Sequence, residues 1–274
     1  MAGTAINAIS SATAGRIDAV GAATGMPRSA LALVLGKVEY AIMVPLVYAA
    51  LVFLLAAIVA RLAAILRAPR QSYQLAIYPA PRRRVLAALR DTFLMPQVLR
   101  RAPLFWLFIV VFHLGLLALI LGHLDLFPAL RILPASSRGM IGAGTVGLAV
   151  TVPTFYFLGR RFMGENRKIS TPGDYLLLLL LLFLFLFGDL MSWGNSWTAS
   201  GFVMTKADFS RYFGILASMS FADPRTVLHG SHYHFIVIHV LLAEALFVVL
   251  PFTKVMHAFL ALPAEALRRT AWKS

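Results

Sequence analysis

Long apolar blocks constrain this chain more than any other feature of its sequence. Five segments, at about 40–60, 104–124, 139–159, 174–192 and 235–260, are dominated by apolar residues. A bilayer span needs roughly 20 such residues, and a helix that is apolar all round has no face suited to water. The sequence therefore predicts an all-α fold, an integral membrane bundle of five transmembrane helices. Its charged fraction of 13% is low for a soluble domain.

The basic residues are unevenly placed around these segments. Most of the 25 lysines and arginines lie between the first two segments, after the third, or near the end of the last. Loops rich in lysine and arginine stay in the cytoplasm, so we expect the N-terminus outside and the C-terminus in the cytoplasm. The net charge of +14 then reflects topology and contact with anionic lipid, and no nucleic-acid partner is expected. The arginine-rich stretch at 61–103 either only fixes topology or also docks a soluble subunit.

Three regions follow from this pattern. We expect an N-terminal extension at 1–38 with a surface helix near 5–23, a membrane domain at 39–263, and a cytoplasmic tail at 264–274. The chain has no cysteine. It therefore cannot form disulfides, thiolate-ligated haem, covalently attached haem or cysteine-ligated iron–sulfur clusters. Any iron–sulfur chemistry must belong to a partner chain.

Four histidines lie in the second and fifth predicted spans: His113 and His123, then His239 and His257. An imidazole inside a bilayer is costly without a partner, so such residues indicate function. On a helix the first two lie roughly 15 Å apart along the axis, and the last two lie about five turns apart on one face. The two spans are antiparallel, so pairing by depth joins His123 with His239 outside and His113 with His257 inside. We predict that the four histidines are the axial iron ligands of two haems.

Neighbouring residues agree with this prediction, and alternatives stay open. Gly115 and Gly122 are expected to let a porphyrin approach the backbone, and Pro251 should kink the last helix. His232 is the main rival for the outer ligand. It belongs to a cluster with His229 and His234 that is read as an interfacial turn, a proton-handling group or a weak zinc site. The histidines could also serve a haem-free transporter as proton relays, and a one-haem protein or a structural anchor are further options.

The remaining polar residues have modest expected roles. Asp174 is expected to cap the start of the fourth span. Arg160, Arg161 and Lys254 either snorkel at the cytoplasmic boundary or contact haem propionates. Asp125, Asp189 and Glu244 are candidate proton acceptors, but the sequence assigns no catalytic base.

Three motifs carry a resemblance to a known family. They are Phe112-His-Leu-Gly with Leu-Gly-His123, Ser170-Thr-Pro-Gly-Asp-Tyr175, and His239 followed by Leu250-Pro-Phe-Thr-Lys-Val-Met-His257 and Pro263. Over residues 40–263 the chain resembles the membrane cytochrome b (gamma) subunit of respiratory nitrate reductase. This group includes the membrane cytochromes of sulfite-reductase-associated and heterodisulfide-reductase-like complexes.

The resemblance implies five helices, two haem b groups, and a quinone or quinol substrate near the outer haem. It also implies a cytoplasmic iron–sulfur protein subunit and the same four ligands. The family's quinol-site lysine has no secure counterpart, although Arg131 and Arg138 lie nearby in sequence. The long stretch at 192–231 and the N-terminal extension favour a sulfur-metabolism relative with an outer-side subunit. The expected location is the bacterial or archaeal cytoplasmic (inner) membrane.

Overall fold

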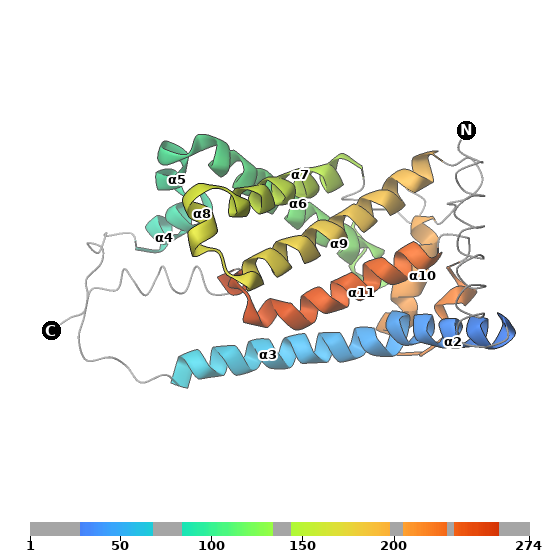
Figure 1. The fold of residues 1–274 in the computed structure, drawn as a ribbon. Helices are drawn as coiled ribbons and strands as arrows, with labels where there is room; N and C mark the ends of the chain where they lie inside the picture. The colour runs from blue at the N-terminus through green and yellow to red at the C-terminus, as the bar shows by residue number, and fades with distance from the viewer. Residues whose placement is uncertain (1–27, 68–83, 134–143, 198–204, 229–232, 258–274) are drawn as a thin grey trace.

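The regular elements of this protein are helical throughout the part of the chain that is described. The computed structural model describes residues 28–67, 84–133, 144–197, 205–228 and 233–257 (Figure 1). The long helices are α2 (Arg28–Ala41), which continues through a π-helical turn (Ile42–Leu46) into α3 (Val47–Arg67), then α6 (Pro103–Leu126), α7 (Thr145–Phe162), α9 (Pro172–Trp197) and α11 (Tyr233–Val249). The short helices are α4 (Arg84–Phe93), α5 (Pro96–Arg101), α8 (Gly164–Ile169) and α10 (Lys206–Ala217), and 3₁₀ turns cover Pro128–Leu130, Pro224–Thr226, Leu250–Phe252 and Lys254–Met256.

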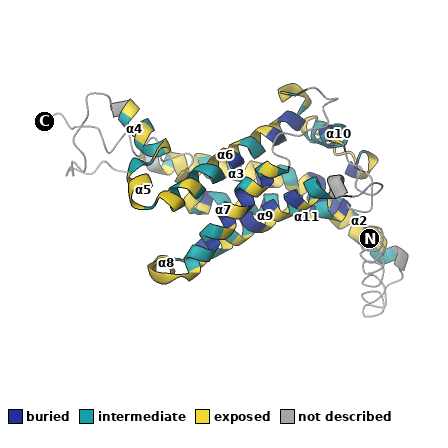
Figure 2. Cartoon of the chain, turned by 90° about the horizontal axis from the view of Figure 1, so that it is seen from above, coloured by how far each residue is buried: buried dark blue, intermediate teal, exposed yellow. Residues whose placement is uncertain are grey.

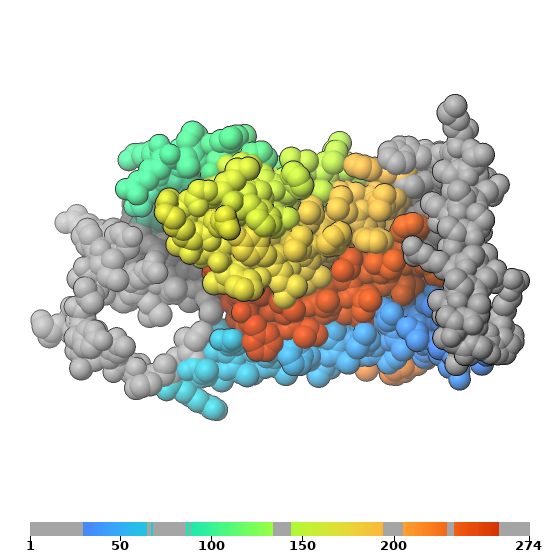
Figure 3. Space-filling view, viewed as in Figure 1, coloured from blue at the N-terminus to red at the C-terminus, as the bar shows by residue number. Residues whose placement is uncertain are grey.

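The long helices pack in an order that differs from their order in the chain. α6 packs on α7, α7 on α9, α9 on α11, and α11 on α3. On the face shown in Figure 3, α3, α11 and α9 lie side by side. One apolar cluster joins α7 to α9 through Val150, Leu177, Leu181 and Phe185. A second joins the α2–α3 helix to α10 and α11 through Met43, Val44, Tyr212 and Ile236. α7 and α9 therefore connect the two histidine-bearing helices, α6 and α11, through their packing contacts.

The outward faces of the bundle are apolar, as a bilayer requires. Val52 on α3 is 66% exposed and Phe155 on α7 is 68% exposed. Figure 2 shows exposed residues along the outer faces and buried ones along the contacts. Four described helices are long and apolar enough to cross a membrane, at Ala30–Ala64, Pro103–Leu126, Pro172–Trp193 and Tyr233–Phe252. α7, the predicted third span, has 18 residues, carries Arg160 and Arg161 in its last turn and is not one of these four.

The first long helix starts earlier than the apolar pattern indicates. It begins at Arg28, so the expected domain boundary at residue 38 falls inside a helix, while the helix expected near 5–23 lies outside the described residues. Pro45 occupies the π-helical turn. A proline has no N–H to donate to the preceding turn, and this explains why the regular hydrogen-bond ladder shifts there.

The last helix breaks where a kink was expected. α11 ends at Val249, and two 3₁₀ turns follow, separated by Thr253 in an extended conformation (φ −106°, ψ 172°). His257 follows the second turn, so the spacing argument based on five continuous turns does not describe how it is positioned. Within the arginine-rich stretch, two short helices, α4 and α5, are joined through Met95 with φ of 42°. α4, α5, α8 and the end of α3 gather at one end of the bundle, and α10 lies at the other (Figure 1).

Candidate functional site

The four predicted ligand histidines come together as two pairs between α6 and the α11 segment. The ring centres of His123 and His239 are 6.3 Å apart, and their planes differ by 13°. The ring centres of His113 and His257 are 6.1 Å apart, and their planes differ by 70°. These are the partners that pairing by depth predicts. The pairing is a fact of geometry, while the ligand role itself stays a prediction.

These separations suit two imidazoles on opposite sides of one metal ion. A transition metal takes an imidazole nitrogen at about 2 Å, and that nitrogen lies about 1.2 Å from the ring centre, so the ring centres should be roughly 6.3 Å apart. Both measured distances agree with this value.

The hydrogen bonds of the four rings select one tautomer. Nδ1 of His113 lies 2.7 Å from the carbonyl oxygen of Ile109, and Nδ1 of His123 lies 2.8 Å from that of Leu119. The corresponding distances are 3.1 Å from His239 to Leu184 and 2.7 Å from His257 to Lys254. A carbonyl oxygen only accepts, so each Nδ1 must carry the proton and donate. Each Nε2 is then left with its lone pair available for a metal, and the Nδ1–H bond fixes the ring's orientation.

α9 positions His239, one of the predicted ligands, although it supplies no predicted ligand of its own. Its Leu184 carbonyl accepts the His239 hydrogen bond. A Cβ on Gly188 would lie 3.3 Å from Cε1 of His239, so glycine provides the room for this ring. Sequence reasoning missed both residues, because neither lies near the ligand motifs in the chain.

Gly115 has a different role from the one expected. A Cβ there would lie 2.9 Å from Cγ1 of Val150 and 3.3 Å from Cβ of Ala149. Its lack of a side chain therefore permits α6 to pack closely on α7. The neighbouring candidate Gly122 is buried, which is compatible with either role.

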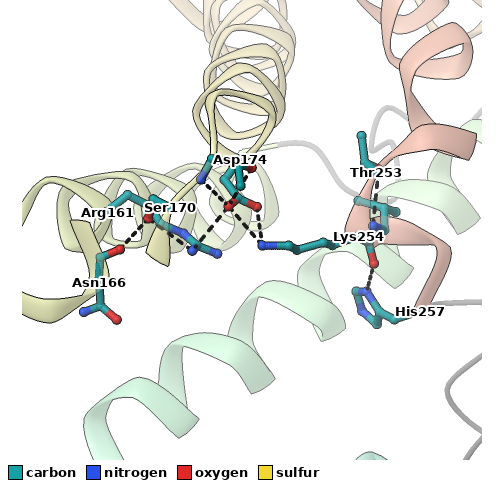
Figure 4. A network of polar contacts seen from close by, with 9 residues as sticks. Arg161, Asn166, Ser170, Asp174, Thr253, Lys254 and His257 are labelled. Carbon is teal, nitrogen blue, oxygen red and sulfur yellow. Dashed lines mark hydrogen bonds and ion pairs between the residues drawn. The ribbon is translucent and has the colours of Figure 1, made fainter. Parts of the chain in front are cut away.

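At the arginine-rich end, one network links α7, α9 and the turn that carries His257 (Figure 4). Nζ of Lys254 lies 2.8 Å from Oδ1 of Asp174, and Nη1 of Arg161 lies 3.7 Å from Oδ2. The Asp174 carboxylate also accepts from the Thr171 backbone N–H at 3.0 Å, which confirms the predicted capping role. Arg160 lies over the Phe105 ring, 3.9 Å from its centre. Lys254 and Arg161 thus have protein partners at this boundary.

At the opposite end, Asp125 forms a buried ion pair that the sequence did not reveal. Nζ of Lys206 lies 2.5 Å from Oδ2 of Asp125, and the two side chains are 3% and 1% exposed. Oδ1 of Asp125 accepts from the backbone N–H groups of Ile132 and Leu133 at 2.5 and 2.7 Å. This carboxylate joins α6 to α10 and to the segment after α6. Such extensive pairing argues against its predicted role as a proton acceptor.

A second polar group lies where α2 meets the start of α11. Glu39, 3% exposed, accepts from Nη2 of Arg225 and from Nδ1 of His234, the latter at 2.6 Å. The hydrogen bond from Arg225 to Glu39 raises the pKa of the guanidinium above its ordinary value. This arrangement gives His234 a structural partner, whereas His229, His232 and Arg138 lie outside the described residues. Arg131 donates to Ser210 at 2.8 Å.

The other two candidate proton acceptors are buried in different environments. Asp189, on α9, accepts from the Thr151 hydroxyl of α7 at 2.7 Å. Glu244, on α11, is 4% exposed, and neither of its carboxyl oxygens has a hydrogen-bond partner among the described residues. Within a bilayer an unpaired carboxylate is expensive, so Glu244 stays a candidate functional residue.

The fold and the site together define a multi-pass membrane protein, helical throughout its described residues, in which four histidines face each other in pairs. A model of the nitrate reductase gamma subunit family matches residues 92–272, and the chain belongs to this family. The resemblance drawn from the three motifs is thereby confirmed. The family and the apolar helices make this a multi-pass protein of a prokaryotic cytoplasmic membrane.

A curated relative agrees with this membership. Over 166 residues the chain is 30% identical to the Hdr-like menaquinol oxidoreductase cytochrome b-like subunit of Archaeoglobus profundus. The match covers 56% of this chain and 46% of the relative, so it spans about half of the relative's length.

Proposed function

We propose that this chain is the membrane cytochrome b subunit of a respiratory oxidoreductase complex. Its two haem b groups would exchange electrons between the quinone pool on the outer side and a cytoplasmic iron–sulfur partner subunit. The observation that carries the proposal is the pairing of His123 with His239 and of His113 with His257, at ring-centre distances of 6.3 and 6.1 Å. Family membership supports a redox role.

The protein's own contribution is to hold and orient the cofactors. Nε2 of each histidine would bind iron, and the backbone carbonyl on Nδ1 holds each ring in place. Bound haem supplies reversible one-electron chemistry, which protein side chains do not provide. The two pairs lie about ten residues apart along α6, so the electron path would extend roughly 15 Å through the bundle.

The topology of the proposal has five spans, with α7 as the third. The N-terminus would lie outside and the C-terminus in the cytoplasm. The arginine-bearing helices α4, α5 and α8 lie together at one end of the bundle, which agrees with a single cytoplasmic face. The outer end then holds His123, His239 and the Asp125–Lys206 pair. We place the quinone site at this end, and its protons would leave to the outside.

The cytoplasmic face is proposed to dock the iron–sulfur subunit. Arg100 and Arg101 on α5 are exposed there. A cationic surface steers an acidic partner and makes association sensitive to salt. Reversing charge at Arg100 and Arg101 should lower the association rate with the partner. An unchanged rate and salt dependence would place the docking surface elsewhere.

Haem quantification tests the central proposal. The purified protein should give the reduced-minus-oxidised spectrum of b-type haem and two haems per chain by pyridine haemochrome analysis. His123→Ala and His257→Ala should each reduce the content toward one, and the double variant should bind none. The control His234→Ala changes a histidine outside both pairs and should keep two.

Other outcomes have clear meanings. A well-folded protein without haem would refute the ligand assignment and favour a haem-free transporter that relays protons through its histidines. One haem in the unaltered protein would identify a one-haem relative. Loss of the outer haem in His232→Ala, but not in His239→Ala, would assign the outer ligand to His232.

A further inference from the structure

His257 differs from the other ligand histidines in how its ring is held. His113 and His123 donate to carbonyls four residues earlier on the same helix, so α6 alone can orient them. His257 lies beyond the end of α11 and donates to the Lys254 carbonyl at 2.7 Å, within a 3₁₀ turn of three residues. A short 3₁₀ turn has poor hydrogen-bond geometry and little stability of its own. The orientation of His257 therefore depends on what holds this turn.

The turn is held by the first turn of α9. Nζ of Lys254 lies 2.8 Å from Oδ1 and 2.9 Å from Oδ2 of Asp174, so it contacts both carboxylate oxygens. Asp174 is 7% exposed and accepts from the N–H and hydroxyl of Thr171, at 3.0 and 3.1 Å. These bonds, together with the helix dipole, fix the carboxylate at the start of α9. The connection then runs from Asp174 to Lys254 and, through the Lys254 backbone, to the His257 ring (Figure 4).

We propose that Asp174 and Lys254 are positioning residues for the inner haem. Their ion pair fixes the turn whose carbonyl orients His257 and thereby sets the plane of its imidazole. This inference rests on the proposed function, because it takes His257 as an iron ligand. Lys254 then does more than snorkel at the boundary, and Asp174 does more than cap the start of α9, because together they orient His257.

The orientation has a spectroscopic signature. The His113 and His257 planes differ by 70°, whereas the His123 and His239 planes differ by 13°. In low-spin ferric haem with two imidazole ligands, parallel rings split the iron d orbitals strongly and give a rhombic paramagnetic resonance signal. Nearly perpendicular rings leave the orbitals close in energy and give a highly anisotropic signal. The inner haem should therefore give the more anisotropic signal, and the outer haem the rhombic one.

Substitution of Lys254 tests the inference. Lys254→Met removes the ammonium group but keeps the length of the side chain and the backbone carbonyl. We expect the anisotropic signal to shift or broaden and the inner haem to be partly lost, while the rhombic signal stays unchanged. Asp174→Asn should have the same effect. Lys254→Arg keeps the cation and should largely restore the signal.

Controls separate positioning from general damage. Lys168→Met removes an exposed lysine at the same end, paired with Glu165 at 2.7 Å, and should change neither signal. The outer haem within each variant reports that the bundle is folded. If Lys254→Met and Asp174→Asn keep two haems and both signals of the unaltered protein, the positioning role is refuted. If the unaltered protein binds no haem, the proposed function itself fails, and the two failures are thus distinguishable.

Discussion

Replacing Lys206 by methionine should strongly destabilise this protein, because this lysine is buried in an ion pair. Its ammonium group lies 2.5 Å from the Asp125 carboxylate, with the two side chains 3% and 1% exposed. Removing one partner of a buried pair leaves the other charge uncompensated, at a cost of about 3–5 kcal/mol. The backbone N–H groups of Ile132 and Leu133 still bind the carboxylate, so we expect the lower end, about 3 kcal/mol. That corresponds to a change of roughly 100-fold in the equilibrium constant for unfolding.

The assay is equilibrium unfolding in mixed micelles, with the free energy of unfolding compared between variants. Lys168→Met is the matched control, because its pair with Glu165 has a similar distance of 2.7 Å but side chains 71% and 86% exposed. An exposed pair contributes about 0–1 kcal/mol. The double variant Asp125→Asn with Lys206→Met should recover much of the loss, because it leaves no buried charge. If Lys206→Met loses no more than Lys168→Met, the argument from burial is refuted.

Three further predictions concern close contacts and burial. Gly188→Val should displace the ring of His239 and lower haem content toward one per chain, because even the Cβ of the new side chain would lie 3.3 Å from Cε1 of His239. Full retention of two haems would contradict this prediction. Gly147→Ala should lower the melting temperature, because its Cβ would overlap the Asp189 carboxylate of α9. Such overpacking costs about 1–3 kcal/mol. Gly159→Ala on the same helix is the control, since a Cβ there would have no neighbour within 4 Å and the change should be neutral or stabilising. Burial raises the pKa of Tyr212 above its ordinary value of 10.0. The neutral phenol therefore makes its full contribution to stability below pH 10.0, and this contribution is lost as the pH rises above 10.0. A Tyr212→Phe variant should lose about 1 kcal/mol near pH 8 and less at pH 11, and an equal loss at both pH values would count against this reasoning.

The sequence was informative wherever the determinants are local. Apolar blocks of about 20 residues predict long helices wherever they occur, and a spacing of ten residues places His113 and His123 on one helix. Pairing by depth needed only the antiparallel arrangement of two helices. The start of the fourth long helix was also predictable, because Thr171 and Asp174 form a local capping pattern.

Long-range contacts were not predictable in this way. Lys254 pairs with a carboxylate 80 residues away, and Glu39 accepts from Arg225 across 186 residues, so no local pattern indicates either contact. Lys37 and Glu39 interrupt the apolar residues before the first predicted span. The sequence pattern therefore did not indicate that this helix begins at Arg28. Pro251 predicted a disturbance, but whether a proline kinks or ends a helix depends on what can satisfy the freed backbone groups.

The different partners of the four Nδ1 atoms have a consequence for biogenesis. The two rings on α6 are oriented as soon as that helix forms in the membrane, because Ile109 and Leu119 belong to the same helix. The other two rings are oriented only when their own segments pack against α9, since one donates directly to Leu184 and the proposed support of the other comes from Asp174 through Lys254. During synthesis, one ring of each histidine pair is thus oriented early, and its partner is oriented only when the final segments dock. Cofactor insertion would then be a late event that marks successful assembly of the whole bundle.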